Sequence, residues 1–222
     1  MNPIASSNPD CGFLLPHESL MPSINAPNLE LIRRALAATA FDDQPADSMQ
    51  AAVALVLAGE PSDLHLCLIR RAEHELDPWS GHMALPGGRV DPGDTNPRTA
   101  AVRETSEEVG LRLERSTHLG SLGTRPVTSA GGPTGVSLFS FVFHLGETLE
   151  PLVPSDEVAE AFWVPLRHLL DARNAAYRRA TRDGQIREQP AVTYQGHLIW
   201  GLTYRVLTTF FERLELQIAR PE

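Results

Sequence analysis

Three glutamates lie close together near the middle of the chain, at Glu104, Glu107 and Glu108. On a helix they would stand within one turn of each other, and like charges at this spacing destabilise an isolated helix by about 0.2–0.5 kcal/mol per pair. A divalent cation would remove that repulsion. Mg²⁺ is typically bound through one or two carboxylates together with substrate phosphates, so the cluster favours metal-assisted cleavage of a phosphate compound. The alternative is a solvated acidic surface, which is what most such clusters are.

The residues that precede the cluster favour the metal site. Gly87 and Gly88 permit a close approach of the backbone to a ligand or metal, or else form a bulge. Asp94 lies in the loop that follows, and Arg103, four residues before Glu107, can orient a carboxylate by hydrogen bonding. Together these residues favour a functional site over a chance cluster of surface acids.

The segment from Gly88 to Leu111 resembles the Nudix box, the signature of a family of diphosphate hydrolases. The resemblance implies an enzyme of the α/β class with an α/β/α sandwich and a mixed sheet over roughly residues 50–216. It also implies Mg²⁺ or Mn²⁺ as the cofactor and a small-molecule nucleotide as the substrate.

The same resemblance implies the metal ligands. Glu107 and Glu108 are similar to the family's principal ligands, and Glu104 is similar to a further ligand or to the general base. Gly88 would contribute its carbonyl oxygen, and Asp94 would act from the loop, directly or through water.

Two further residues receive catalytic roles by resemblance. Arg103 would orient the glutamates. Family members differ in the position of the general base, and some use an acid from a downstream loop. Glu157, just ahead of a predicted strand, is therefore the alternative to Glu104 as the base, unless it is an ordinary surface acid.

Several features are similar to the coenzyme A diphosphatase branch of the family: Asp94 in place of an early glutamate, a loop before Arg103 that is one residue longer than usual, and the segment 199–203. We therefore expect coenzyme A or acyl-coenzyme A to be cleaved to adenosine 3′,5′-diphosphate and (acyl-)4′-phosphopantetheine. An arginine that this branch would carry near Asp77 is absent. ADP-ribose, dinucleotides and nucleoside triphosphates stay open as substrates. A further alternative is a sensor that binds a nucleotide without cleaving it.

Four arginines are candidates to hold the phosphates, each with an ordinary surface position as its alternative: Arg70, Arg71, Arg89 and Arg125.

The glutamates require a helix to position them, and its ends can be read from the sequence. Asn96 is a good N-cap, Pro97 fits the first helical position, and Gly110 is a good helix end. The helix is predicted to present its three glutamates on one side and to bury the opposite side, which carries Val102, Thr105 and Val109.

The remaining elements follow from hydrophobic periodicity and turn residues. Strands are predicted at 51–58, 64–69, 136–145 and 159–164, and helices at 29–40, 165–171 and 202–216. Residues 1–47 are predicted to form a leader and a short helix, and residues 48–222 the Nudix hydrolase domain.

Composition limits the classes of partner. The formal net charge of -9 disfavours broad attraction to nucleic-acid phosphates, and all 19 basic residues are arginine, which excludes catalytic-lysine chemistry. The two cysteines, Cys11 and Cys67, have no metal-ligand neighbours at useful spacing and are expected to be reduced. No apolar run approaches the roughly 18 residues of a spanning helix. We expect a cytoplasmic enzyme without a nucleic-acid or membrane partner, and a homodimer is left open.

Overall fold

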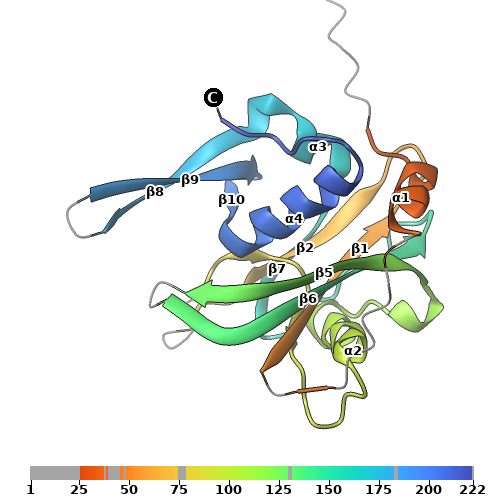
Figure 1. The fold of residues 1–222 in the computed structure, drawn as a ribbon. Coiled ribbons are helices and arrows are strands. Elements are labelled where there is room, and N and C mark those ends of the chain that lie inside the picture. The colour runs from red at the N-terminus through yellow and green to blue at the C-terminus, as the bar shows by residue number, and fades with distance from the viewer. Residues whose placement is uncertain are drawn as a thin grey trace, which may run out of the picture.

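A computed structural model describes residues 26–37, 39, 46–47, 49–74, 79–129, 132–182 and 185–221. Within these ranges the chain forms a large mixed sheet with helices on both faces and a second, smaller sheet beside it (Figure 1). The predicted α/β/α sandwich with a mixed sheet is confirmed.

The larger sheet is built around strands β1 and β6, which lie side by side. Strand β1 pairs in parallel with β6 and antiparallel with β2 and β4, which makes the sheet mixed. Strand β2 pairs further with β3 and β7, and β6 pairs with β5. The strands of this sheet are β1 (Gln50–Ala58), β2 (His65–Arg71), β3 (Met83–Ala84), β4 (Gly87–Arg89), β5 (Thr117–Ser129), β6 (Gly132–Gly146) and β7 (Val158–Pro165).

Strand β1 shows why helices cover both faces. Successive side chains of a strand point to opposite faces. Ala52 and Ala54 pack into the core beneath helix α2 (Pro97–Val109), whereas Leu55 and Leu57 pack into the core on the other face. That second core also contains side chains of α1 (Leu29–Leu36), α3 (Leu166–Leu170) and α4 (Gly201–Arg213). Because β1 is apolar on both sides, it can lie only between two layers.

The predicted ends of the glutamate helix are confirmed. The Asn96 side chain accepts a hydrogen bond from the Thr99 backbone N–H, and the Thr99 hydroxyl accepts one from the Asn96 backbone N–H. Gly110 ends the helix in the left-handed region with φ 74°. The other predicted helices and strands are also present, although several are longer or shorter by a few residues.

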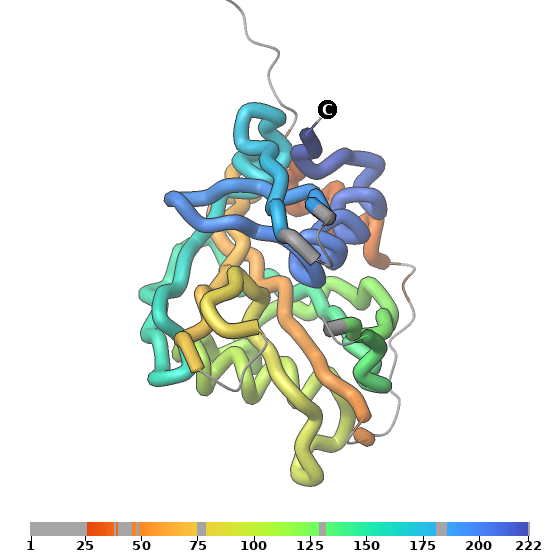
Figure 2. The backbone as a smooth tube through the Cα atoms, turned by 90° about the vertical axis from the view of Figure 1, so that its left-hand side faces the viewer, coloured from red at the N-terminus to blue at the C-terminus, as the bar shows by residue number. Residues whose placement is uncertain are grey.

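The smaller sheet was not predicted. It consists of β8 (Ala175–Arg182), β9 (Gln185–Tyr194) and β10 (His197–Trp200), and it leads directly into α4. Two short 3-10 turns lie at Leu113–Arg115 and Ala172–Asn174. Figure 2 shows the β8–β9 ribbon, in blue, above the yellow segment that carries β3 and β4.

Three statements about the chain's organisation are limited by the described ranges. Most of residues 1–47 outside the short helix lie outside these ranges, so the division into 1–47 and 48–222 stays a prediction. Cys67 is buried and free, and Cys11 lies outside the described residues. No helix of the described chain is long and apolar enough to cross a membrane.

Candidate active site

The glycine pair joins the central sheet to the glutamate helix. Gly87 and Gly88 lie in β4, opposite Val53 and Ala52 of β1. Gly87 has φ 147°, and a Cβ there would collide with the backbone of Ala52 and Val53. A Cβ on Gly88 would collide with the carboxylate of Glu104. The two glycines therefore allow the sheet edge and the helix to approach closely.

Glu108 lies in that contact, and its position corrects the predicted division of the helix into a buried and an acidic side. Its carboxylate is only 4% exposed and accepts a hydrogen bond of 2.8 Å from the Gly87 backbone N–H. Thr105 and Val109 are buried as predicted, but Val102 is only partly buried. The glutamates do not share one solvated face, because the partner of Glu108 is the strand beside the helix.

Burial has a clear effect on the ionisation of this group. It raises the pKa of Glu108 to about 7, and the carboxylates of Glu104 and Glu157 add to the effect. The Gly87 N–H and Arg71, whose guanidinium lies 4.0 Å from the Glu108 carboxylate, oppose it. The group lacks enough nearby positive charge to remain fully ionised at neutral pH without a further cation.

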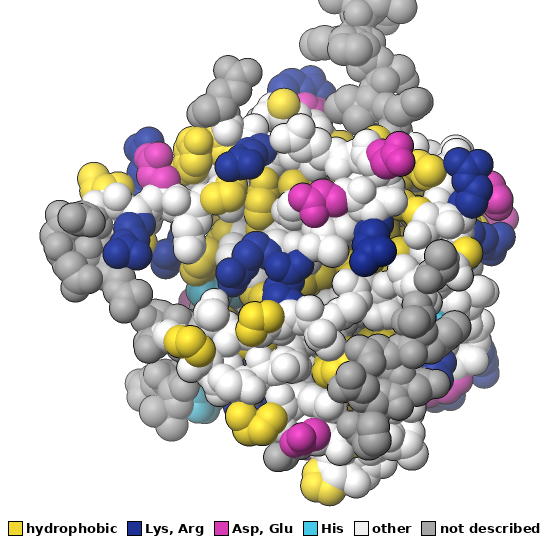
Figure 3. All heavy atoms as spheres, in the orientation of Figure 1, with side chains coloured by type: hydrophobic (Ala, Val, Ile, Leu, Met, Phe, Trp, Pro, Cys, Tyr) yellow, Lys and Arg dark blue, Asp and Glu magenta, His cyan; other side chains and the backbone are white. Residues whose placement is uncertain are grey.

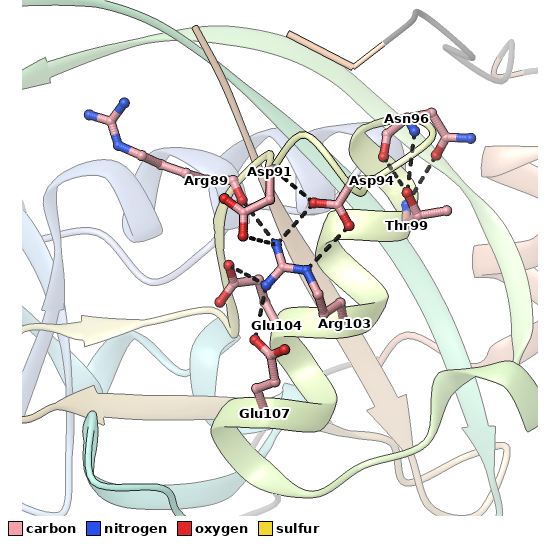
Figure 4. A network of polar contacts seen from close by, with 8 residues as sticks. All are labelled: Arg89, Asp91, Asp94, Asn96, Thr99, Arg103, Glu104 and Glu107. Carbon is pink, nitrogen blue, oxygen red and sulfur yellow. Dashed lines mark hydrogen bonds and ion pairs between the residues drawn. The ribbon is translucent and has the colours of Figure 1, made fainter. Parts of the chain in front are cut away.

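Arg103 is the centre of the polar network on the exposed side of the helix (Figure 4). Its Nη1 atom donates to Glu104 at 3.0 Å and to Glu107 at 2.9 Å. Its Nε and Nη2 atoms donate to the two carboxylate oxygens of Asp94 at 3.2 and 3.0 Å, and Nη2 also donates to the carbonyl of Arg89. One guanidinium thus connects the helix to the loop that precedes it, a planar fork geometry that lysine could not reproduce.

The two partly buried carboxylates that Arg103 contacts, Asp94 and Glu104, have pKa values shifted in opposite directions. Asp94 is partly desolvated, which alone would raise its pKa, but the hydrogen bonds from Arg103 and from the Asp91 backbone N–H outweigh burial and hold the pKa below its usual value. Burial raises the pKa of Glu104 above its usual value despite the contact with Arg103. Asp94 is therefore a firmly ionised anchor for Arg103, and Glu104 is the more basic carboxylate.

Glu157 reaches the same site from a distant part of the chain. The segment before it is bound to the end of α2, because the backbone N–H groups of Val153 and Ser155 donate to the carbonyls of Val109 and Glu108. The carbonyl of Glu157 itself accepts from the Ala72 N–H at 2.8 Å. These contacts bring Glu157 to the cavity that Glu104 and Glu108 also line.

The donor set suits a hard cation. The carboxylates of Glu104 and Glu157 lie close enough to Glu108 to raise its pKa, and carboxylate and carbonyl oxygens are the ligands that Mg²⁺ prefers. In the described ranges, no group of three or more acidic, histidine or cysteine side chains is already arranged as a metal cage. Glu104 and Glu107 are instead turned to Arg103, so metal binding would require them to exchange this partner in part.

A cavity of about 1020 Å³ extends from the glutamates to the smaller sheet. Gly87 and Gly88 border it, and its apolar lining residues include Leu85, Val127 and Leu138. Two of its aromatic walls are Trp79 and Trp200. Its length and mixed surface suit a ligand with both charged and apolar parts.

The structure divides the four arginines that were candidates for phosphate binding. Arg71 and Arg89 line the cavity. Arg70 instead pairs with Glu160 at 2.7 Å, and Arg125 donates to Thr209 of helix α4 outside the lining residues.

Sequence reasoning missed the residues of the cavity that follow β7. They include Arg178 and Arg187 of the smaller sheet and Arg205 of α4, whereas Trp200 lies in the segment 199–203 that the sequence had pointed to. The sequence of β8 offers no signal for them, because Arg178 and Arg179 are adjacent and only the pairing with β9 shows which of them faces the cavity.

Comparisons with known proteins identify the family of this chain. The NUDIX domain family model matches residues 48–184. Human mitochondrial coenzyme A diphosphatase NUDT8 is 39% identical over 132 residues, which cover 59% of this chain and 54% of the human protein. The chain thus spans about half the length of that relative.

Two further proteins cover more of the chain. The uncharacterised Nudix hydrolase NudL of Photorhabdus laumondii is 31% identical over 180 residues, which cover 77% of this chain and 87% of that protein. The crystal structure of a MutT/nudix family protein from Enterococcus faecalis aligns over 79% of this chain and 64% of its own, with a TM-score of 0.49 at 22% identity. With a family model that matches well over half of its residues, and with the carboxylate helix and glycine pair described above, this chain belongs to the Nudix family of hydrolases.

Proposed function

We propose that this Nudix hydrolase cleaves the diphosphate linkage of coenzyme A or acyl-coenzyme A, giving adenosine 3′,5′-diphosphate and (acyl-)4′-phosphopantetheine. The observation that carries the proposal is the cavity: one space brings the carboxylates of Glu104, Glu108 and Glu157 together with arginines and apolar walls. The similarity to a human coenzyme A diphosphatase supports the choice of substrate.

The size of the cavity supports a large substrate. Ligand pockets for small molecules commonly measure about 300–1,000 Å³, so a cavity of about 1020 Å³ is at the upper end of that range. A nucleotide alone would leave much of it empty. Coenzyme A joins a nucleotide, a diphosphate and a long pantetheine chain, and the apolar lining residues of the cavity suit the last of these.

The proposed metal ligands are the residues expected from the family resemblance: Glu107 and Glu108, with Glu104, the carbonyl of Gly88, and Asp94 directly or through water. Mg²⁺ or Mn²⁺ bound there would neutralise charge on the diphosphate and lower the pKa of an attacking water. Asp94 ion-pairs with Arg103 at 3.0 Å, which supports an indirect role.

The chain's own residues would then orient the site and accept the proton. Arg103 holds Glu104 and Glu107 in place through Nη1. Glu104 is half-buried with a raised pKa, and these properties suit a general base. Glu157 lines the same cavity but is exposed, so we propose Glu104 as the base and keep Glu157 as the alternative.

Arg71 and Arg89 are proposed to contact the diphosphate. Both line the cavity beside the glycine pair, and a guanidinium is well matched to phosphate oxygens. Arg70 and Arg125, which we also considered, have other partners in this structure. A cytoplasmic location and a homodimer stay predictions; the name of the human relative describes that protein as mitochondrial.

The proposal is tested with the full chain and a panel of coenzyme A, ADP-ribose, NADH and nucleoside triphosphates, each with Mg²⁺, with Mn²⁺ or with EDTA, and with products identified by mass. We expect metal-dependent release of adenosine 3′,5′-diphosphate from coenzyme A. Preferential cleavage of ADP-ribose or of triphosphates would reject the substrate. Binding without any product would indicate a nucleotide sensor.

A pair of variants tests the site itself. Glu107→Gln should fold normally and lose nearly all turnover, while Glu114→Gln, at an exposed glutamate just beyond the helix, should keep it. Retained activity in Glu107→Gln would contradict the assigned role of the carboxylate helix.

A further inference from the structure

The charge of the cavity differs from that of the whole chain. The chain has a formal net charge of -9, yet arginines outnumber acidic residues among those that line the cavity. The acidic residues are Glu104, Glu108 and Glu157, and the arginines are Arg71, Arg89, Arg178, Arg187 and Arg205. The glutamates come from helix α2 and the segment before β7, whereas the last three arginines come from β8, β9 and α4. The cavity therefore has an acidic end and a separate basic wall.

The register of the β8–β9 ribbon explains the basic wall. Arg178 pairs across the ribbon with Gln189, and Ala180 pairs with Arg187. Cross-strand partners share a face, as do residues two apart on a strand, so these four side chains occupy one face of the ribbon. All four line the cavity. On the other face Arg179 pairs with Glu188 at 2.7 Å.

Two arginines of the wall, Arg178 and Arg205, contact groups that do not neutralise them. The guanidinium carbon of Arg178 lies 4.0 Å from the centroid of the Trp200 ring, a cation–π contact that orients the side chain and leaves its positive charge in place. Arg205 donates to the Thr128 hydroxyl at 3.5 Å. Within the described part of the chain, no carboxylate forms an ion pair with Arg178, Arg187 or Arg205.

Arg125, which lies outside the lining of the cavity, adds positive charge beside Arg205. Arg125 donates to the Arg205 carbonyl and to Thr209, and burial together with the charge of Arg205 lowers its pKa. Figure 3 shows several dark blue side chains, which are arginine in this sequence, near the centre of the face drawn, with a magenta acidic side chain close to them. The carboxylate of Glu212 offsets this effect in part, and the remaining positive charge favours the binding of an anion.

We propose that Arg178, Arg187 and Arg205 form a subsite for a phosphate monoester that the substrate carries apart from its scissile diphosphate. In coenzyme A this group is the 3′-phosphate. The diphosphate must lie at the acidic end, where the metal would bind, so the basic wall is left for another anionic group. A phosphate monoester is close to dianionic at neutral pH, and arginine forks bind such groups by paired, charge-assisted hydrogen bonds. The assignment rests on the proposed function insofar as the substrate is taken to enter this cavity.

The experiment compares coenzyme A with 3′-dephospho-coenzyme A, which lacks only the monoester. For the unaltered protein we expect a higher kcat/KM with coenzyme A. Arg178→Gln and Arg187→Gln should each lower kcat/KM for coenzyme A by about tenfold, as expected for losing one charge-assisted contact, and change the value for the dephospho compound by less than about twofold. The matched control is Arg179→Gln, on the opposite face of the ribbon, which should leave both values unchanged.

The outcomes separate the subsite from the proposed function. If coenzyme A is cleaved but the two compounds are used equally, or if the variants lower both values alike, the subsite is wrong and the proposed function stands. If neither compound is cleaved, the proposed function fails. The subsite is then tested by calorimetry, which compares the affinity of the protein for adenosine 3′,5′-diphosphate with its affinity for adenosine 5′-monophosphate. A preference for the former that Arg178→Gln removes supports the subsite, and equal binding overturns it. Circular dichroism checks that each variant is folded. If Arg178→Gln, at a half-buried residue, does not fold, Arg187→Gln, at an exposed residue, provides the test.

Discussion

Glu108→Gln should stabilise the metal-free protein at alkaline pH. The carboxylate is buried and its pKa is raised from an ordinary value of 4.5 to about 7, so between these values the folded protein holds a proton that the unfolded chain releases. The free energy of unfolding therefore falls as the pH rises through this interval, and the stability present below pH 4.5 is lost above pH 7. At about 1.4 kcal/mol per pKa unit, the full loss is about 3 kcal/mol. A glutamine keeps the hydrogen bond from the Gly87 N–H and avoids the buried charge.

The assay is urea unfolding in EDTA at pH 4.5 and at pH 8. We expect Glu108→Gln to match the unaltered protein at the lower pH and to exceed it by about 3 kcal/mol at the higher one. Glu107→Gln serves as the control, because its side chain is 59% exposed and its replacement should not produce this difference between the two pH values. Added Mg²⁺ should raise the stability of the unaltered protein at pH 8 and have less effect on Glu108→Gln. An equal stability of the two proteins at pH 8 would refute the reasoning.

Three further predictions concern the same region. Arg103→Gln removes the shared partner of Asp94, Glu104 and Glu107. It should lower the free energy of unfolding by about 1–3 kcal/mol, measured by denaturant unfolding, and lower kcat by more than about tenfold, measured by initial rates. An unchanged kcat would contradict the positioning role of Arg103. Gly88→Ala should lower turnover, since its Cβ would displace the Glu104 carboxylate, and a normal rate would show that this contact is dispensable. Asn96→Ala removes the N-cap of α2 and should lower the free energy of unfolding by about 1 kcal/mol. The activity per folded molecule should stay within about twofold of the unaltered protein. A large loss of activity would mean that the cap also shapes the site.

The features that were predictable from the sequence are those set by neighbouring residues. The ends of α2 follow from Asn96, Pro97 and Gly110 because capping is a local interaction. The central strands β1 and β2 follow from apolar runs separated by a turn. The pairing of Arg103 with Glu107 follows from helical spacing alone.

The features that were not predictable depend on contacts between distant segments. Glu108 was predicted on the acidic side of the helix, opposite its buried side, and it is buried because β4 lies against the helix at Gly87, twenty-one residues earlier. Strand β8 has arginines on both faces and no apolar period, so only its pairing with β9 identifies it as a strand. The basic wall needed the register of that ribbon before its arginines could be assigned to one face.

The cavity also crosses the boundary of the segment that this chain shares with the whole family. The family model ends at residue 184, between β8 and β9, whereas Arg187, Trp200 and Arg205 line the cavity beyond that point. A protein shortened to the family segment would lose half of the ribbon, and with α4 it would lose the buried Phe210 and Phe211 of the core. The carboxylate helix and Arg178 therefore lie inside the family segment, whereas Arg187 and Arg205 of the basic wall lie beyond it. Exchange of the C-terminal part between relatives could change which diphosphate is accepted while the residues that cleave it stay the same.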